Sequence, residues 1–267
     1  KFVTTFHGTY NENNSLKSYY NSVMTRGDAV IAISEFIAGH IRRNYGVPKN
    51  ILRVIHRGVD LGRFSLTNIS ENRVERLARK WRLPDGVPVI MLPGRVTRWK
   101  GQEVFIQAIK KAGLNNLKCL IVGSDQGRHR YKASLEKLIE QAELSDVIHL
   151  IDHCDDMPAA YMLADIVVSA SIEPEAFGRV VVEAQALGRL VVATDHGATQ
   201  ETIENGSTGW LITPNDPDAM AEMLKTLLSY TREERENIST MAIQHVNSNF
   251  SKEEMCEKTI KLYQSMV

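Results

Sequence analysis

Short runs rich in valine and isoleucine recur along the chain and alternate with longer segments that have the composition of helices. Within each run the apolar residues are continuous, which is typical of strands buried on both faces of a sheet. Repetition of strand, helix and strand favours parallel sheets with right-handed crossovers. The sequence therefore predicts an α/β fold, with strands at residues 1–6, 29–34, 52–56, 87–92, 117–123, 147–150, 166–170, 190–194 and 210–213.

The composition changes between the third and fourth runs, where residues 71–82 form a charged segment that is compatible with a helix and marks a junction between domains. The runs after this junction suffice for a complete doubly wound domain, whereas those before it do not. We expect boundaries at 1–75, 76–248 and 249–267, the last being an amphipathic helix capped by Ser251. The basic residues of the junction are interpreted as a solvated helix face: Arg73, Arg76, Arg79, Lys80 and Arg82.

Charge and composition exclude several classes of protein. The formal net charge of the 267 residues is zero, so no nucleic-acid partner is expected. The sequence shows neither an apolar run long enough to cross a membrane nor a signal peptide. Cys119, Cys154 and Cys256 are far apart, which favours reduced thiols in a cytoplasmic protein over a disulfide framework or a zinc site.

Two glutamates, Glu175 and Glu183, lie eight positions apart in the segment EAFGRVVVE. Phe177 and Gly178 are expected to open a helix that ends near Leu187, although three consecutive valines favour a strand. The first N–H groups of this helix would bind an anion, and Gly178 would leave room for a phosphate. About one and a half turns into the helix, Glu183 would accept hydrogen bonds from a vicinal diol such as a ribose. Taken alone, both glutamates are equally compatible with solvated surface residues.

A basic loop with the sequence PGRVTRWKG follows the predicted strand 87–92. Arg95 and Lys100 would converge on a diphosphate, the arginine as a bidentate fork and the lysine as a point charge. Together they would neutralise charge that develops on a leaving diphosphate, as Mg²⁺ does elsewhere. For Arg98 in the same loop we favour a solvated position. His7 directly follows the first predicted strand and would be exposed to a cleft, although a lone histidine is more often structural.

These loops follow one another in an order that resembles the retaining GT-B glycosyltransferases of family 4, also called glycosyl transferases group 1. The resemblance covers essentially the whole chain. Its motifs are His7-Gly8, Gly58-Val59-Asp60, Gly94-Arg95 with Lys100-Gly101, Val122-Gly123, Glu175 with Glu183, and His196-Gly197 followed by Glu201, Asn205-Gly206 and Gly209. It implies two Rossmann-like domains facing a cleft. The N-terminal domain would bind an acceptor, the second domain a nucleotide-sugar donor, and the last helix would cross back to the first domain.

The resemblance also implies roles for single residues. Glu183 matches the glutamate that holds the ribose hydroxyls, and Glu175 the one that contacts the sugar hydroxyls. Arg95 and Lys100 match the diphosphate-binding pair, and His7 the histidine near the reacting sugar. Further donor contacts, which include a base-binding segment at 150–154, are expected at Gly94, Ile151, Cys154, Phe177, Gly178, Arg179 and Val180. The implied partners are a nucleotide-sugar and a glycan or lipid-linked acceptor, with peripheral contact to a membrane surface and neither metal nor cofactor.

The sequence departs from the family in three places, of which the loop Ser-Asp-Gln-Gly after Gly123 is an acceptable variant. Arg57 stands where the family usually has asparagine before Gly58, a change that we expect to be tolerated at a surface turn. The glycine-rich loop that the family carries near its N-terminus is not in this sequence, and the chain begins within a predicted strand. We therefore expect the N-terminal domain to be incomplete, by about a hundred residues.

The function predicted from these features is metal-independent transfer of a sugar to an acceptor hydroxyl with retained configuration, in cell-envelope or lipid-linked glycan synthesis. The alternative is a nucleotide-sugar-binding module or inactive partner subunit without turnover. A dinucleotide-dependent dehydrogenase is disfavoured, because the glycines after the strand at 117–123 lack the G-x-G-x-x-G spacing.

Overall fold

The computed structural model describes residues 1–10 and 15–266 of the chain. Its strands are β1 (Val3–Phe6), β2 (Ala29–Ala32), β3 (Leu52–Val54), β4 (Val89–Pro93), β5 (Lys118–Val122), β6 (Ile148–Ile151), β7 (Ile166–Ser169), β8 (Leu190–Thr194) and β9 (Trp210–Ile212). Each of these strands overlaps one of the predicted runs, so the predicted α/β class is confirmed.

The α-helices are α1 (Ser15–Asn21), α2 (Glu35–Tyr45), α3 (Glu71–Lys80), α4 (Gln102–Ala112), α5 (His129–Gln141), α6 (Met157–Leu163), α7 (Arg179–Ala186), α8 (Thr199–Thr202), α9 (Pro217–Leu228), α10 (Arg232–Asn249) and α11 (Lys252–Gln264). Short 3₁₀ helices are η1 (Ser22–Thr25), η2 (Leu66–Asn68) and η3 (Arg98–Lys100). Among the residues that the structure describes, no helix combines the length and the hydropathy needed to cross a bilayer.

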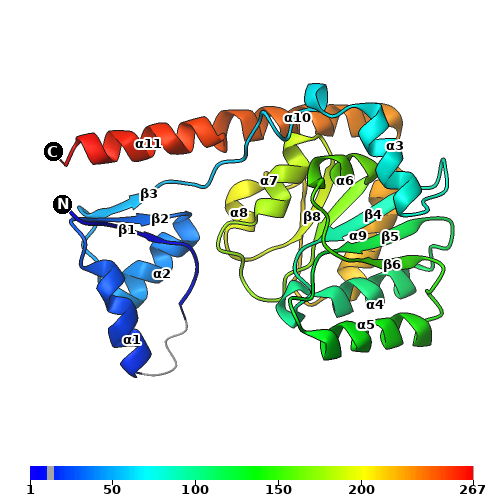
Figure 1. The fold of residues 1–267 in the computed structure, drawn as a ribbon, viewed down its shortest axis with the longest axis horizontal. Coiled ribbons are helices and arrows are strands. Elements are labelled where there is room, and N and C mark those ends of the chain that lie inside the picture. Colours follow the sequence, from blue (N-terminus) through cyan, green and yellow to red (C-terminus); the bar gives the residue numbers. More distant parts are fainter. Residues whose placement is uncertain (11–14, 267) are drawn as a thin grey trace.

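Parallel strands form the larger sheet in the order β6-β5-β4-β7-β8-β9 (Figure 1). The chain enters at β4, winds outward to β6, returns to β7 beside β4 and continues outward to β9. This is the doubly wound order of a Rossmann-like sheet. The winding reverses between β4 and β7, and such sheets bind ligands at the carboxyl ends of the strands on either side of that reversal.

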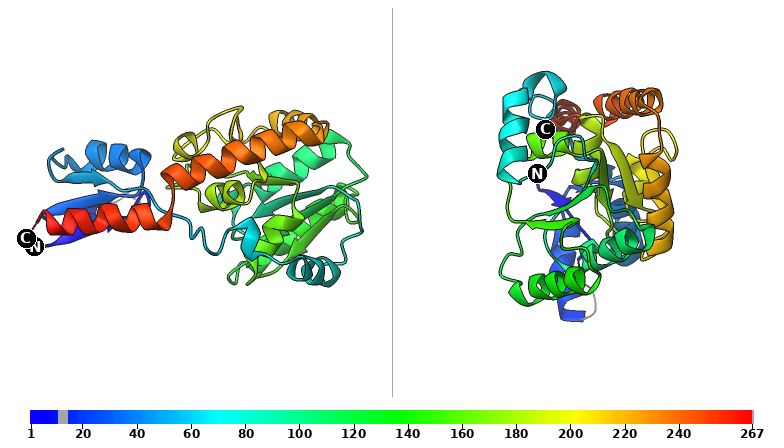
Figure 2. Two further views of the ribbon diagram at one scale, coloured as in Figure 1. Left: turned by 90° about the horizontal axis from the view of Figure 1, so that it is seen from above. Right: turned by 90° about the vertical axis from the view of Figure 1, so that its right-hand side faces the viewer.

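Helices cover both faces of this sheet (Figures 1 and 2). On one face α4, α5 and α9 pack around buried residues such as Phe105 and Leu224. On the other face α6, α7 and α10 pack around Tyr161 and Val181. Neighbouring residues of one strand therefore enter different cores, which is why the strands carry continuous apolar runs.

A smaller parallel sheet, in the order β1-β2-β3, lies beside the large one (Figure 1). The buried residues Ile37 and Ile41 place α2 on one face of it. Helix α11 packs on the other face, where Leu262 contacts the cluster of Ala29 and Ile31. The helix predicted at this end of the chain is thus confirmed. Leu262, with Met255 and Met266, packs on the small sheet, whereas Ile260 and Tyr263 are exposed.

The connection between α10 and α11 is fastened to the linker that follows β3. The Val59 N–H donates to the Phe250 carbonyl oxygen at 2.8 Å, and the Lys252 N–H donates to the Val59 carbonyl oxygen at 2.9 Å. Ser251 caps α11, because its hydroxyl accepts a hydrogen bond from the Glu254 N–H. The predicted N-cap is confirmed. The chain therefore crosses between the two sheets twice, and the two crossings are hydrogen-bonded to each other.

The interpretation of the basic junction segment as a solvated face is wrong for Arg73. Its guanidinium donates two hydrogen bonds to Asp156, at 2.7 and 3.1 Å, and a third to the Asn68 carbonyl oxygen. Asp156 is also the N-cap of α6, so the pair joins α3 to α6. Arg79 does face solvent, where it forms an ion pair with Glu75.

Candidate active site

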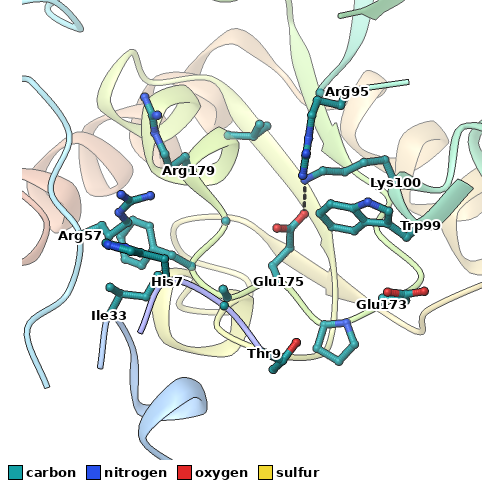
Figure 3. Close-up of a pocket in the computed structure, with 17 residues that line it drawn as sticks. His7, Thr9, Ile33, Arg57, Arg95, Trp99, Lys100, Glu173, Glu175 and Arg179 are labelled. Atoms are coloured by element: carbon teal, nitrogen blue, oxygen red, sulfur yellow. Dashed lines mark hydrogen bonds and ion pairs between the residues drawn. The ribbon is translucent and has the colours of Figure 1, made fainter. Parts of the chain in front are cut away.

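A cavity of about 600 Å³ opens at the carboxyl ends of β4 and β7 and faces the carboxyl end of β1 (Figure 3). Its lining comes from both sheets and includes His7, Gly8, Thr9, Ile33, Arg57, Gly94, Arg95, Trp99, Lys100, Glu173, Pro174, Glu175, Ala176, Phe177, Gly178, Arg179 and Val180. The structure therefore brings together the basic loop, the glutamate loop and the histidine that the sequence singled out separately.

Glu175 is 8% exposed and lies at the centre of this cavity. Its Oε1 accepts a hydrogen bond from the Lys100 ammonium and another, at 2.5 Å, from the Ser171 hydroxyl. The two side chains hold the carboxylate in one orientation. Ser171 is a residue that the sequence did not indicate, since a serine after a strand carries no distinguishing signal.

Arg95 lies on the same side of the cavity as Lys100 (Figure 3). Both cations contact the indole of Trp99, with the Arg95 guanidinium 5.6 Å and the Lys100 ammonium 4.3 Å from the ring centroid. The indole is a rigid support that keeps the two charges close together. Arg98, in contrast, points out of this cavity, and its pairing with Glu103 agrees with the expected solvated position.

The glutamate loop ends at Gly178, which is the N-cap of α7. The predicted helix between Phe177 and Leu187 is confirmed, because burial of Val181 and Val182 against the sheet overrides their strand propensity. The backbone gives a further reason for this glycine, and its expected role of leaving room for a phosphate stays a prediction. A Cβ at Gly178 would make only ordinary contacts, whereas its φ of 79° disfavours any other residue.

A second hollow, of about 500 Å³, adjoins the cavity and shares Gly94, Arg95, Arg179 and Val180 with it. Its other lining residues include Arg63, Phe64, Gly123, Ser124, Cys154, Asp155, Met157, Tyr161 and Glu183. The expected base-binding residue Cys154 thus faces this hollow, whereas Ile151 lines neither space. The carbonyl of Ile151 accepts the Gly123 N–H at 2.9 Å, so Ile151 supports the Gly123 turn.

Glu183 is buried in the wall of this hollow, and both of its carboxylate oxygens have partners. Oε2 accepts from the Tyr161 hydroxyl at 2.9 Å and Oε1 from the Arg179 guanidinium at 2.8 Å. Burial and then the adjacent Glu183 raise the pKa of Tyr161 well above its usual value, so the phenol is a permanent donor. Tyr161 was not predicted, because its position on α6 reads as an ordinary core aromatic.

Arg57 contradicts the expectation of a surface turn. Its side chain is half-buried and lines the cavity beside His7, and Figure 3 shows both on the wall opposite Lys100. Burial and then the charge of Arg179 lower the pKa of Arg57. Burial and then Arg57 lower the pKa of His7, which favours the neutral imidazole.

Gly101 positions the basic loop, and its replacement tests how tightly that loop is held. A Cβ at Gly101 would lie 1.8 Å from the Ala170 carbonyl oxygen, and its φ is 71°. We expect Gly101→Ala to lower the free energy of unfolding by about 2–5 kcal/mol, from steric overlap added to backbone strain. Urea denaturation measures the change. Gly86→Ala is the matched control, because Gly86 has the same φ of 71° and open space around it. Equal losses in both variants would contradict the steric explanation.

Glu201, in α8, connects the part of the chain that forms the large sheet to α2 and His56 of the part that forms the small sheet. Its carboxylate accepts hydrogen bonds from the Glu35 and Phe36 N–H groups of α2, both at 2.7 Å, and lies 2.9 Å from Nε2 of His56. Burial raises the pKa of Glu201, but the hydrogen bonds from His56 and the two N–H groups outweigh it, and the pKa lies below its ordinary value of 4.5. The ionised carboxylate of Glu201, which belongs to the part of the chain around the large sheet, therefore caps the N-terminus of α2 beside the small sheet.

This depressed pKa predicts a pH dependence of stability. A carboxyl group whose folded pKa lies below its unfolded pKa stabilises the fold above the unfolded value and loses that effect as pH falls through the folded value. We expect the parent chain to be more stable than Glu201→Gln at about pH 7, and the difference to shrink below pH 4.5. Urea denaturation at a series of pH values measures it, with Glu140→Gln on the exposed face of α5 as control. If the difference in the free energy of unfolding between the parent chain and Glu201→Gln is the same at every pH, the ionised Glu201 carboxylate is not what stabilises the fold.

Two family profiles match the chain over most of its length. The profile of the glycosyl transferases group 1 matches residues 73–245, and that of glycosyltransferase family 4 matches residues 1–63. The first profile alone covers more than half of the 267 residues. The chain belongs to the glycosyl transferases group 1 family. The resemblance seen in the sequence is therefore confirmed.

Named relatives agree with this assignment. A D-inositol 3-phosphate glycosyltransferase of Corynebacterium urealyticum is 30% identical over 97% of this chain and 62% of its own length. A putative colanic acid biosynthesis glycosyltransferase, WcaL, of Salmonella typhimurium is 28% identical over the whole chain and 64% of its own length. The crystal structure of a glycosyltransferase from Rickettsia africae superposes with a TM-score of 0.92 at 36% identity, over 98% of this chain and 70% of that one.

This group 1 glycosyl transferase chain spans less than two thirds of the length of those two curated relatives. The large sheet, the small sheet and the crossing helix α11 form the GT-B arrangement that the sequence predicted. The candidate site lies between the two sheets, where residues of both line one cavity.

Proposed function

We propose that the chain carries the donor site of a glycosyltransferase that moves a sugar from a nucleoside-diphosphate sugar to an acceptor hydroxyl. The observation that carries the proposal is one cavity in which Arg95, Lys100 and the N-terminus of α7 face each other around Glu175. Two fixed cations and the N–H groups of Arg179 and Val180 at the start of α7 suit a diphosphate, and a held carboxylate suits the hydroxyls of the attached sugar. The adjoining hollow with Glu183 has room for the ribose and the base.

The donor reacts in this proposal with retained configuration. The bond from the anomeric carbon to the leaving phosphate loosens first, which gives that carbon oxocarbenium character. Arg95, Lys100 and the α7 N-terminus stabilise the negative charge on the departing diphosphate. A phosphate oxygen of the leaving group then accepts the proton of the acceptor hydroxyl on the same face of the sugar.

Glu175 is an orienting group in this reaction and not its nucleophile. Its Oε1 already accepts hydrogen bonds from Lys100 and Ser171, which reduces its ability to attack carbon. Charge neutralisation by Arg95 and Lys100 replaces the part that Mg²⁺ has in other transferases. The proposed transfer is therefore independent of metal, and its rate is expected to persist in the presence of EDTA.

The acceptor enters from the wall of the cavity that the small sheet contributes, where His7 faces the reacting sugar. We assign the acceptor to the glycans or lipid-linked saccharides of cell-envelope polysaccharide synthesis, because the similar protein WcaL is named for colanic acid biosynthesis. A cytoplasmic location, with peripheral contact to a membrane surface that presents such an acceptor, belongs to the same proposal.

A thermal-shift panel of UDP-, GDP- and ADP-sugars tests the donor site. A ligand that binds the native chain raises its melting temperature, so one nucleotide series is expected to stabilise the protein and the others are not. Release of free sugar from the stabilising donor then tests catalysis. Binding without hydrolysis or transfer by the complete protein would support a nucleotide-sugar-binding module instead. Absence of any stabilisation would contradict the donor site itself.

A further inference from the structure

Arg57 is a cation of the cavity that the donor site described above does not use. It follows β3 in the linker between the two sheets, and its half-buried side chain faces the cavity beside His7. Within residues 1–10 and 15–266 the Arg57 guanidinium makes no hydrogen bond and no ion pair. A guanidinium carries five N–H donors in a planar fork that matches a carboxylate or a phosphate.

The charges around Arg57 do not compensate it. Arg179, whose charge acts on Arg57, is itself a cation, and after burial it is the second cause that lowers the pKa of Arg57. Arg179 also has its own carboxylate in Glu183. Of the acids that line the cavity, Glu175 is held by Lys100, and Glu173 lies at the far end of the view in Figure 3. A partly desolvated cation without a counter-ion is stabilised by any anion that reaches it.

Arg57 and His7 also lie apart from the cations assigned to the diphosphate. Figure 3 shows Arg95 and Lys100 on one wall of the cavity and Arg57 with His7 on the other, with Glu175 between them. The first pair comes from the loop after β4 of the large sheet, and the second from the small sheet and its linker. If a nucleoside diphosphate occupies the first wall, as proposed above, the saccharide part of the substrate would lie toward the second wall of this cavity of about 600 Å³.

We propose that Arg57, with His7 beside it, is a second anion-binding point that selects a substrate with an acidic group, a carboxylate or a phosphate, on its saccharide part. The acidic group belongs either to the transferred sugar, as in a hexuronic acid donor, or to the acceptor, as in a phosphorylated saccharide. Either source would present the same kind of anionic group to Arg57 and His7. This inference rests on the proposed function, because it presupposes that a nucleoside diphosphate occupies the opposite wall.

Calorimetry with Arg57→Gln tests the separation of the two anion sites. The variant removes the charge and keeps a polar side chain, and Arg57→Lys restores the charge. The affinity for the nucleoside diphosphate that the panel identifies is expected to change less than about twofold. Inorganic phosphate is then titrated into each chain saturated with that nucleotide. Its affinity for Arg57→Gln is expected to be at least about tenfold lower than for the parent chain, which is the loss typical of one charged hydrogen bond. Arg57→Lys is expected to recover the affinity for phosphate. Arg53→Gln is the control, because Arg53 is exposed in β3 and outside the cavity.

Two further titrations identify the source of the acidic group. If Arg57→Gln lowers the affinity for nucleotide-linked glucuronic acid but not for nucleotide-linked glucose, the acidic group belongs to the donor sugar. If, with the nucleoside diphosphate bound, Arg57→Gln lowers the affinity for glucose 6-phosphate but not for glucose, the acidic group belongs to the acceptor. If Arg57→Gln lowers the affinity for the free nucleoside diphosphate as much as the affinity for phosphate, Arg57 is a diphosphate ligand and the inference is overturned. Unchanged binding of all probes would overturn it as well. Failure of every nucleoside diphosphate to bind the parent chain would refute the proposed function instead.

Discussion

Replacing Lys100 with alanine is expected to reduce turnover by about two to three orders of magnitude while donor affinity falls by less than about tenfold. The ammonium lies against Glu175 and Trp99, at the wall where the leaving diphosphate is proposed to gain charge. A cation that acts on developing charge contributes more in the transition state than in the ground state. Steady-state kinetics gives the turnover, and calorimetry gives the donor affinity.

Lys137→Ala is the control for this experiment, because Lys137 is exposed on α5 and remote from the cavity. Loss of Lys100 also removes a partner from the buried Glu175, so the melting temperature of each variant is measured before its kinetics. Lys100→Arg keeps the charge in a different shape and is expected to recover part of the turnover. Equal losses in turnover and in donor affinity for Lys100→Ala would argue against a role in the transition state.

Replacing Glu183 with alanine is expected to weaken donor binding by about a hundredfold, because two hydrogen bonds from a diol to a carboxylate together contribute about 3 kcal/mol. The buried carboxylate accepts from Tyr161 and Arg179 in the free chain. The Arg179 side chain is 64% exposed, so the ribose displaces it at little cost. Calorimetry with the donor measures the change.

The diol itself distinguishes this role from a structural one. The parent chain is expected to prefer the ribose nucleotide over its 2′-deoxy form, and Glu183→Ala to bind both with the same affinity. Tyr161→Phe is the companion variant, because it removes the hydroxyl that orients Glu183 and leaves the carboxylate in place. Its expected loss is smaller than that of Glu183→Ala. A preference for the ribose nucleotide that persists in Glu183→Ala would remove the ribose assignment.

Much of the fold followed from local pattern. Strands buried on both faces need continuous apolar runs, and the positions of these runs are visible in one dimension. The same is true of the N-cap at Ser251 and of the loops that carry Arg95, Lys100 and Glu175, since loops after parallel strands gather at one edge of a sheet. The doubly wound order then placed these three side chains in a single cavity.

Contacts between distant segments were not predictable in this way. The clamp of Glu201 on α2 joins residues more than 160 positions apart, and the pairing of Tyr161 with Glu183 joins two helices that only the sheet aligns. The pairing of Arg73 with Asp156 has the same origin. The neighbouring sequence of a charged or aromatic residue does not show whether that residue lies on the surface or forms a contact with a distant segment.

Local sequence was enough to predict the α/β class, the order of the strands along the chain and the loops that bear the proposed donor-site residues, because periodicity and turn chemistry are properties of neighbouring residues. The contacts across the cavity depend on how the two sheets pack, because they join side chains that are far apart in the sequence. Arg57 shows the difference most clearly, since its local sequence reads as a surface turn. The linker that carries it is hydrogen-bonded to the crossing between α10 and α11, and this turns the guanidinium toward His7 and the cavity.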